Sequence, residues 1–250
     1  MSKIKKPLLF ALALVPIAIV AGIFTAFYQI DIYDGEIMDE ILAQIGSIEL
    51  LVAVTAIQTV GYAVFCGFFG YILADKTGLW RKIRFEKNPL IITLGVSLIL
   101  GIIFSLDYWT FGSIIDGIQE STASGLSFSA MMASVLYGGV IEEVMLRLFF
   151  MSLLVFIISR IFCKGKERIP RIVYLAVNII SAVLFAAAHL PATAMLFENL
   201  TFPILFRCFL INGGFGFVFG ELYRRYGLMY SVISHAMCHI VCKIILMIFV

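Results

Sequence analysis

The chain has 250 residues, of which 62% are hydrophobic and 14% are charged, and its mean hydropathy is +1.06. A soluble domain is about half apolar and about a quarter charged, so this composition excludes a water-soluble single domain. The net charge is only +2, and no basic run mixed with aromatic residues argues for a nucleic-acid partner.

Long apolar segments recur along the chain, each near the length of about 20 residues that a helix needs to cross the hydrocarbon core. They predict seven transmembrane helices, near residues 7–30, 47–74, 89–106, 127–160, 171–190, 201–222 and 227–250. The predicted fold class is therefore all-α, a polytopic transmembrane helical bundle of about seven spans. The first apolar run exceeds the core of a signal peptide and no A-x-A site follows it, so we expect a retained helix.

The stretch 34–48, between the first two predicted spans, mixes acidic with apolar residues, and we expect it to lie partly at the membrane interface. Fifteen of the 18 basic residues fall at the N-terminal end or in the connections after the second, fourth and sixth helices. The connections 31–46, 107–126 and 191–200 contain neither Lys nor Arg. By the positive-inside rule the N-terminus is cytoplasmic. We expect a multi-pass integral protein of the plasma membrane, in contact with the lipid bilayer.

The fourth predicted helix carries Glu142, Glu143 and Arg147 in an otherwise apolar segment. Residues four apart share a helix face, so Glu143 and Arg147 are expected to form an ion pair. Glu142 is turned by about 100° and has no partner on its own helix, which suits it to general acid and base catalysis. The alternative interpretation is a packing network with Arg147 or the lining of an ion path.

All three histidines lie in the last third of the chain: His189, and the i, i+4 pair His235 and His239. The pair shares one helix face and can address one point in space. Together with a free carboxylate, three imidazoles can activate water and stabilise an oxyanion. The same set could hold a zinc ion. Neither the zinc-protease pattern H-E-x-x-H nor the serine elbow G-x-S-x-G occurs.

Three motifs follow one another along these helices. They read Glu142-Glu143-x-x-x-Arg147, Phe185-x-x-x-His189 and His235-x-x-x-His239. Over roughly residues 126 to 243 the series resembles the CPBP (Abi) family, which includes CAAX prenyl endopeptidases and bacteriocin-immunity proteins. The resemblance implies an intramembrane endopeptidase.

The resemblance also implies a role for each motif. Glu142 and His189 would activate water, His235 in the third motif would hold the oxyanion, and Glu143 and Arg147 would brace the site. His239 departs from the pattern, because the family usually has Asn or Asp there. An imidazole can still donate a hydrogen bond, but it is a better zinc ligand than an amide.

We expect residues 1–125 to supply transmembrane helices without a motif, and residues 126–250 the catalytic core, within one integral membrane domain. The predicted substrate is a membrane-embedded or lipidated peptide or protein, with a possible role in bacteriocin immunity or peptide maturation. The favoured mechanism requires no cofactor, and zinc is the open alternative. A proton- or ion-coupled secondary transporter that uses the same acids and histidines is the competing function, and an inactive scaffold of the same fold is the third.

Overall fold

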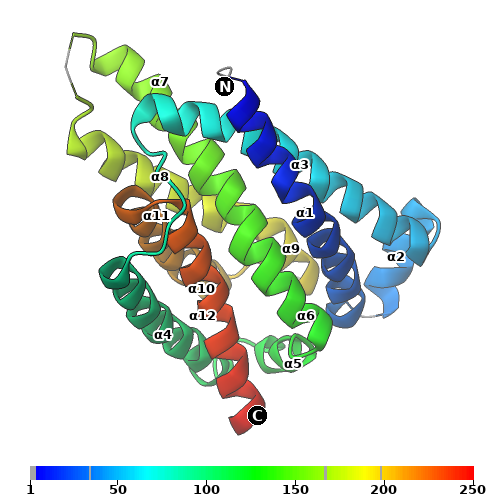
Figure 1. Cartoon of the computed structure of the whole chain (residues 1–250). Coiled ribbons are helices and arrows are strands. Elements are labelled where there is room, and N and C mark those ends of the chain that lie inside the picture. Colours follow the sequence, from blue (N-terminus) through cyan, green and yellow to red (C-terminus); the bar gives the residue numbers. More distant parts are fainter. Residues whose placement is uncertain (1–3, 34, 166–167, 198) are drawn as a thin grey trace.

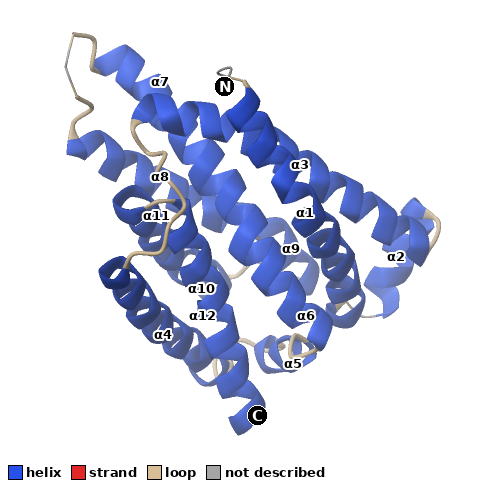
Figure 2. Cartoon of the chain, viewed as in Figure 1, coloured by secondary structure: helices blue, strands red, loops and turns tan. Residues whose placement is uncertain are grey.

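The computed structural model of the chain describes residues 4–33, 35–165, 168–197 and 199–250. The described residues form helices and connections and contain no strand (Figures 1 and 2). The elements are α1 (Lys5–Ile32), α2 (Gly35–Ile45), α3 (Ile48–Thr77), α4 (Lys87–Thr110), α5 (Ile118–Ser124), α6 (Phe128–Ala133), η1 (Ser134–Glu142), η2 (Val144–Met151), α7 (Ser152–Phe162), α8 (Arg171–Ala188), α9 (Leu190–Leu196), α10 (Phe202–Cys208), η3 (Phe209–Gly213), α11 (Gly214–Tyr226) and α12 (Leu228–Phe249).

Seven of the described helical segments are long and apolar enough to cross a membrane. They are Lys5–Ile32, Ile48–Thr77, Lys87–Thr110, Phe128–Phe162, Arg171–Leu196, Phe202–Tyr226 and Leu228–Phe249. The predicted all-α bundle of seven spans is thereby confirmed. The two ends of the chain lie at opposite ends of the bundle (Figure 1). The cytoplasmic N-terminus stays a prediction that rests on the distribution of basic residues.

The connection between α1 and α3 contains the short helix α2, which buries one face against its neighbours. Met38 is its buried residue and packs with Ala26 of α1 and Leu51 of α3. The acidic side chains of Glu36 and Asp39 are exposed. An amphipathic helix of this kind agrees with the interfacial position expected for this stretch.

The main core of the bundle joins the N-terminal helices to the C-terminal half. Leu14 of α1 and Cys66 of α3 pack in one buried cluster with Ile141, Leu148 and Tyr223. Gly70 lets α3 approach the backbone of η2, since an added Cβ would lie 2.9 Å from the carbonyl carbon of Leu148. The N-terminal helices α1 and α3, which carry no motif, therefore pack directly against the fourth span.

The fourth span is wound unusually through its middle. Residues 134–142 and 144–151 form the π-helical segments η1 and η2, which continue without a break from α6 and into α7. The stretch that contains Gly138 and Gly139 has the wider π winding, a rare conformation that is frequent at functional sites.

The packing of α1 against α3 can be tested at the glycine where the two helices cross. An added Cβ at Gly22 would lie 2.5 Å from the Cα of Ala56, whereas at Gly61 it would meet nothing within 4 Å. Gly22→Ala should therefore destabilise the protein by about 1–3 kcal/mol through overpacking. Gly61→Ala is the matched control and should leave thermal unfolding in detergent unchanged or slightly higher. Equal unfolding temperatures for the two variants would contradict this crossing.

Candidate active site

A cavity of about 400 Å³ opens among the helices. Its wall is formed by the C-terminal part of α1, by η1, by the junction of α8 and α9, by η3 and α11, and by α12. Four of the six predicted site residues line this cavity: Glu142, His189, His235 and His239. The structure thus brings together residues of three motifs that are up to 97 positions apart. The cavity that they share is named the central cavity below.

Glu142 is the last residue of η1 and is partly exposed toward the central cavity. Among the residues that the structure describes, none forms a hydrogen bond or an ion pair with its carboxylate. The sequence-based expectation of an acid without a partner on its own helix therefore agrees with the geometry. A carboxylate with free oxygens can accept a proton from water and return it to a leaving group.

Glu143 lies outside the cavity wall and is 0% exposed. Its carboxylate contacts His235 through Oε1, at 3.0 Å from Nδ1, and Arg147 through Oε2, at 3.3 Å from Nε. The Ser231 hydroxyl donates to Oε2 and also lies 3.0 Å from the carbonyl oxygen of Phe219. A buried charge is tolerated only when it is paired and hydrogen-bonded. Glu143 meets both conditions, and in doing so it ties η1 to α12.

Arg147 is the largest fully buried side chain of the described residues, at 0% exposure. Its guanidinium lies 5.1 Å from the ring centroid of Phe185, and Gly216 leaves room for it, since an added Cβ there would come within 3.4 Å of Nη2. None of its three nitrogens hydrogen-bonds to a described residue. The Glu143 carboxylate and the Phe185 ring are therefore the groups that stabilise this buried cation.

His235 is held on three sides. Its ring stacks on Phe219 at a centroid distance of 4.5 Å and on His239 at 5.2 Å, and its Nδ1 faces the carboxylate of Glu143. An ionised carboxylate only accepts hydrogen bonds, so Nδ1 carries the proton in this contact. The other ring nitrogen, Nε2, is then left for whatever occupies the central cavity. A hydrogen bond from one ring nitrogen to a carboxylate is a common way in which a protein sets the orientation and tautomer of a functional imidazole.

The Nε2 atoms of His235 and His239 converge on one glycine. A Cβ added to Gly138 would lie 3.6 Å from Nε2 of His235 and 3.5 Å from Nε2 of His239. The edge of Phe104 packs on the His239 ring at a centroid distance of 5.5 Å. Two parallel imidazoles thus present ring nitrogens to the same point, where a glycine leaves space for a bound atom.

His189 follows the last residue of α8 and lines the same cavity from the side of η3 and α9. Its Nδ1 lies 2.8 Å from the carbonyl oxygen of Phe185. A carbonyl oxygen can only accept, so Nδ1 is the protonated nitrogen and Nε2 of the neutral ring is the basic one. The ring also packs edge-on against Phe185 at a centroid distance of 4.7 Å. The backbone carbonyl at position 185 therefore sets the tautomer of this histidine, and the Phe185 ring packs against its imidazole.

A zinc ion is the open alternative for these side chains. Among the described residues, no group of three or more His, Cys, Asp or Glu side chains is placed to hold a metal. The Glu143 carboxylate already contacts an imidazole, a guanidinium and a hydroxyl. A zinc site needs at least three protein ligands around one point, and only the two stacked histidines converge here. The side chains as arranged do not fit zinc.

Two further basic residues within spans lie near the site. Arg207 pairs with Asp107, with Nε 2.8 Å from Oδ1, and Lys243 donates to the carbonyl oxygen of Gly125. Both cations line a smaller cavity of about 200 Å³ that shares His239 with the central cavity. Arg207 and Lys243 therefore each have a hydrogen-bond partner at the wall of this cavity.

Sequence reasoning missed Ser231, which touches the Glu143 carboxylate. A signal for it was present, since Ser231, His235 and His239 follow at intervals of four and therefore share a face of α12. It also missed the contribution of α1, where Tyr28 and Gln29 line the central cavity. Neither residue stands out by chemistry in an apolar helix without a motif.

Comparison with protein families identifies the motif-bearing part of the chain. Residues 124–241 match the model of a family described as type II CAAX prenyl endopeptidase Rce1-like. The match contains all three motifs and confirms the resemblance to CAAX-protease-like proteins. Neither the search of curated proteins nor the search of solved structures finds a match. Residues 124–241 are thus similar to the Rce1-like family, and α1, α2, α3 and α4 precede the matched region.

The buried ion pair leads to a stability test. Glu143→Leu or Arg147→Met alone leaves one uncompensated charge in the core and should cost about 3–5 kcal/mol. The double variant Glu143→Leu/Arg147→Met should recover most of this loss, because both charges are gone. Thermal unfolding of the four proteins in detergent measures the effect. A double variant no more stable than the single ones would show that the pairing is not the source.

Proposed function

We propose that the protein is an intramembrane endopeptidase that hydrolyses a peptide bond of a membrane-embedded or lipidated substrate. The observation that carries the proposal is the meeting of Glu142, His189 and the two Nε2 atoms of His235 and His239 around one cavity inside the bundle. The Rce1-like match over the same residues supports an endopeptidase of this kind.

In the proposed reaction, water lies between Glu142 and the basic Nε2 of His189. Glu142 accepts its proton, and Nε2 of His189 accepts a hydrogen bond from the same water, as the water oxygen forms a bond to the carbonyl carbon of the substrate. The negative charge that develops on the carbonyl oxygen is accepted at Nε2–H of His235 and His239 beside Gly138. The C–N bond then breaks, and Glu142 returns the proton to the leaving amine. The proposed reaction requires no metal ion.

Glu143 and Arg147 act in this proposal through the groups that they hold. With Nδ1 of His235 donating to Glu143, the ring can donate from Nε2 only when it is doubly protonated. In that form the ring is an imidazolium paired with the Glu143 carboxylate, which holds it in orientation as the acid does in other carboxylate–imidazole pairs. Glu143 is therefore a positioning residue, and Arg147 keeps its carboxylate ionised and in place.

Several features support a substrate that comes from the membrane. The central cavity is lined by aromatic and aliphatic side chains, among them Tyr28, Phe104, Phe215 and Leu196. It lies among the ends of α1, α4 and α8, which lead to the connections without basic residues. With a cytoplasmic N-terminus the cavity faces the outer half of a plasma membrane. This placement suits peptide maturation or immunity to an external peptide better than cleavage of a cytoplasmic protein.

The first test is the isosteric substitution Glu142→Gln. Loss of a general base and acid should lower the rate of peptide cleavage by about 10²-fold or more, while the unfolding temperature stays close to that of the wild type. Cleavage is followed on membrane peptides in proteoliposomes by mass spectrometry, with membrane proteomics of wild-type and variant cells supplying candidate substrates. Undiminished turnover would refute the role of Glu142. Turnover that vanishes with a chelator would refute the metal-free mechanism.

Gly138 allows the oxyanion position to be tested on its own. A methyl group at Gly138 would make ordinary contacts with both Nε2 atoms and fill the space between them, so Gly138→Ala should fold. It should lower kcat by about 10²-fold, as does the loss of an oxyanion donor. Gly139→Ala is the matched neighbour, where the methyl would lie 2.8 Å from Cβ of Ala236 and force η1 away from α12. A Gly138→Ala enzyme with wild-type kcat would place the reacting carbonyl elsewhere.

A further inference from the structure

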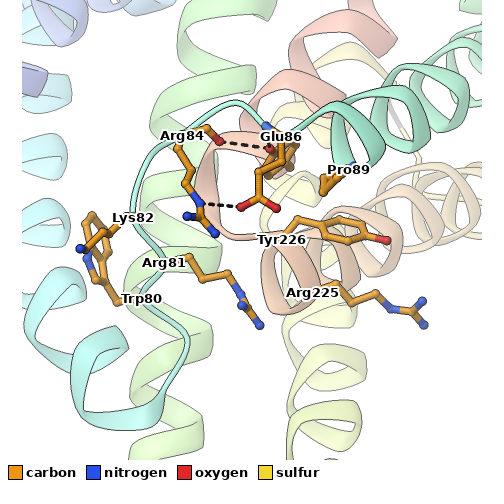
Figure 3. Close-up of a pocket in the computed structure, with 9 residues that line it drawn as sticks. Trp80, Arg81, Lys82, Arg84, Glu86, Pro89, Arg225 and Tyr226 are labelled. Carbon is orange, nitrogen blue, oxygen red and sulfur yellow. Dashed lines mark hydrogen bonds and ion pairs between the residues drawn. The ribbon is translucent and has the colours of Figure 1, made fainter.

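A second cavity, of about 330 Å³, lies where the connection between α3 and α4 meets the turn between α11 and α12 (Figure 3). It is named the basic cavity here. Four cations line it, Arg81, Lys82, Arg84 and Arg225, against the single carboxylate of Glu86. It shares no lining residue with the central cavity and has no part in the proposed hydrolysis.

Most of the positive charge of the basic cavity is not neutralised within the described residues. Arg84 pairs with Glu86, with Nε 2.6 Å from Oε1, but the two side chains are 71% and 47% exposed. The Arg81 guanidinium contacts only a backbone oxygen, that of Arg224, at 3.5 Å. Arg225 shares one carboxylate, that of Glu221, with its neighbour. An exposed pair of this kind is weak, so the guanidinium groups remain available to an anion.

The wall of the basic cavity is nevertheless preformed. The Tyr230 hydroxyl accepts from the backbone N–H of Glu86 at 2.8 Å and donates to the carbonyl oxygen of Arg84 at 3.1 Å. Gly227, at φ +102°, makes a turn so tight that an added Cβ would lie 2.9 Å from Cβ of Arg81. In Figure 3 the guanidinium of Arg84 points toward the carboxylate of Glu86, and the side chain of Arg81, from the same loop, extends toward the side where Arg225 lies. Little ordering is then needed when a ligand binds.

The same loop carries apolar side chains that point away from the protein. Ile83 and Phe85 alternate with the cations and are 61% and 74% exposed. Trp80, three residues after the end of α3, and Tyr226, the last residue of α11, line the cavity beside them. Exposed apolar residues interleaved with cations, next to Trp and Tyr at helix ends, are typical of a segment at the level of lipid headgroups.

We propose that the basic cavity binds the phosphate group of an anionic phospholipid. The guanidinium groups of Arg81 and Arg84 supply donors that match phosphate oxygens, and Ile83 and Phe85 contact the acyl chains. The expected cytoplasmic position of this end agrees with the leaflet that is rich in anionic lipids. Through Tyr230, which precedes Ser231 in α12, the bound lipid holds the end of the helix that carries the histidines.

The experiment uses the full-length protein in nanodiscs of phosphatidylcholine with a minority of phosphatidylglycerol. After exchange into detergent, co-purifying lipids are quantified by mass spectrometry. Phosphatidylglycerol should be enriched on the wild type. Because each cation near an anionic surface contributes about five-fold in affinity, Arg81→Gln/Arg84→Gln should lower this enrichment by about 25-fold. Unfolding temperatures in pure phosphatidylcholine report whether the variant folds.

A matched control removes two exposed cations from the connection between α7 and α8, in the variant Lys164→Gln/Arg168→Gln. It should retain the enrichment. Equal losses in both variants, or no enrichment on the wild type, would overturn the proposal, because attraction would then be a general property of the basic surface. Inorganic phosphate in phosphatidylcholine nanodiscs separates the two sources of phosphate. A thermal stabilisation by phosphate equal to that by phosphatidylglycerol would show that the site takes the free ion instead.

Discussion

The structure depends on keeping the carboxylate of Glu143 charged in the middle of an apolar bundle. A buried ion of this kind is costly unless other groups replace its water, and here a guanidinium, a hydroxyl and an imidazole do so. Two of these partners belong to α12 and one to η2. The requirement to satisfy one charge therefore fixes how the two helices meet. It also leaves His235 in a defined orientation on the wall of the cavity that Glu142 lines.

This arrangement separates two adjacent acids that share the same chemistry. Glu143 is buried and its oxygens contact Arg147, Ser231 and His235, whereas Glu142, the preceding residue, lines the central cavity and forms no hydrogen bond with a described residue. The helix supplies the difference, because successive side chains point in different directions. The carboxylate of Glu143 thus stabilises the packing of the helices, and that of Glu142, in the proposed function, takes part in the reaction.

Much of this could be predicted from the sequence, because the signals are local. Apolar runs of spanning length gave the seven helices, and spacings of four paired Glu143 with Arg147 and His235 with His239. What could not be predicted depends on contacts between distant segments. The lining of the central cavity by Tyr28, the hydrogen bond of Ser231 to Glu143 and the packing of α3 on η2 leave no periodic pattern in the sequence. The roles of the site residues in catalysis stay predictions.

The winding of η1 and η2 has a consequence for comparing this chain with its relatives. A π turn closes its hydrogen bond one residue later than an α turn, so it accommodates more residues than the 3.6 of the α-helix. A relative that lacks one residue in this segment could keep both carboxylates in place by winding the same stretch as α-helix. Alignments that allow no gap between Ser134 and Met151 would then shift every position on one side. Length variation inside a transmembrane helix, normally a sign of a wrong alignment, is here compatible with an unchanged site.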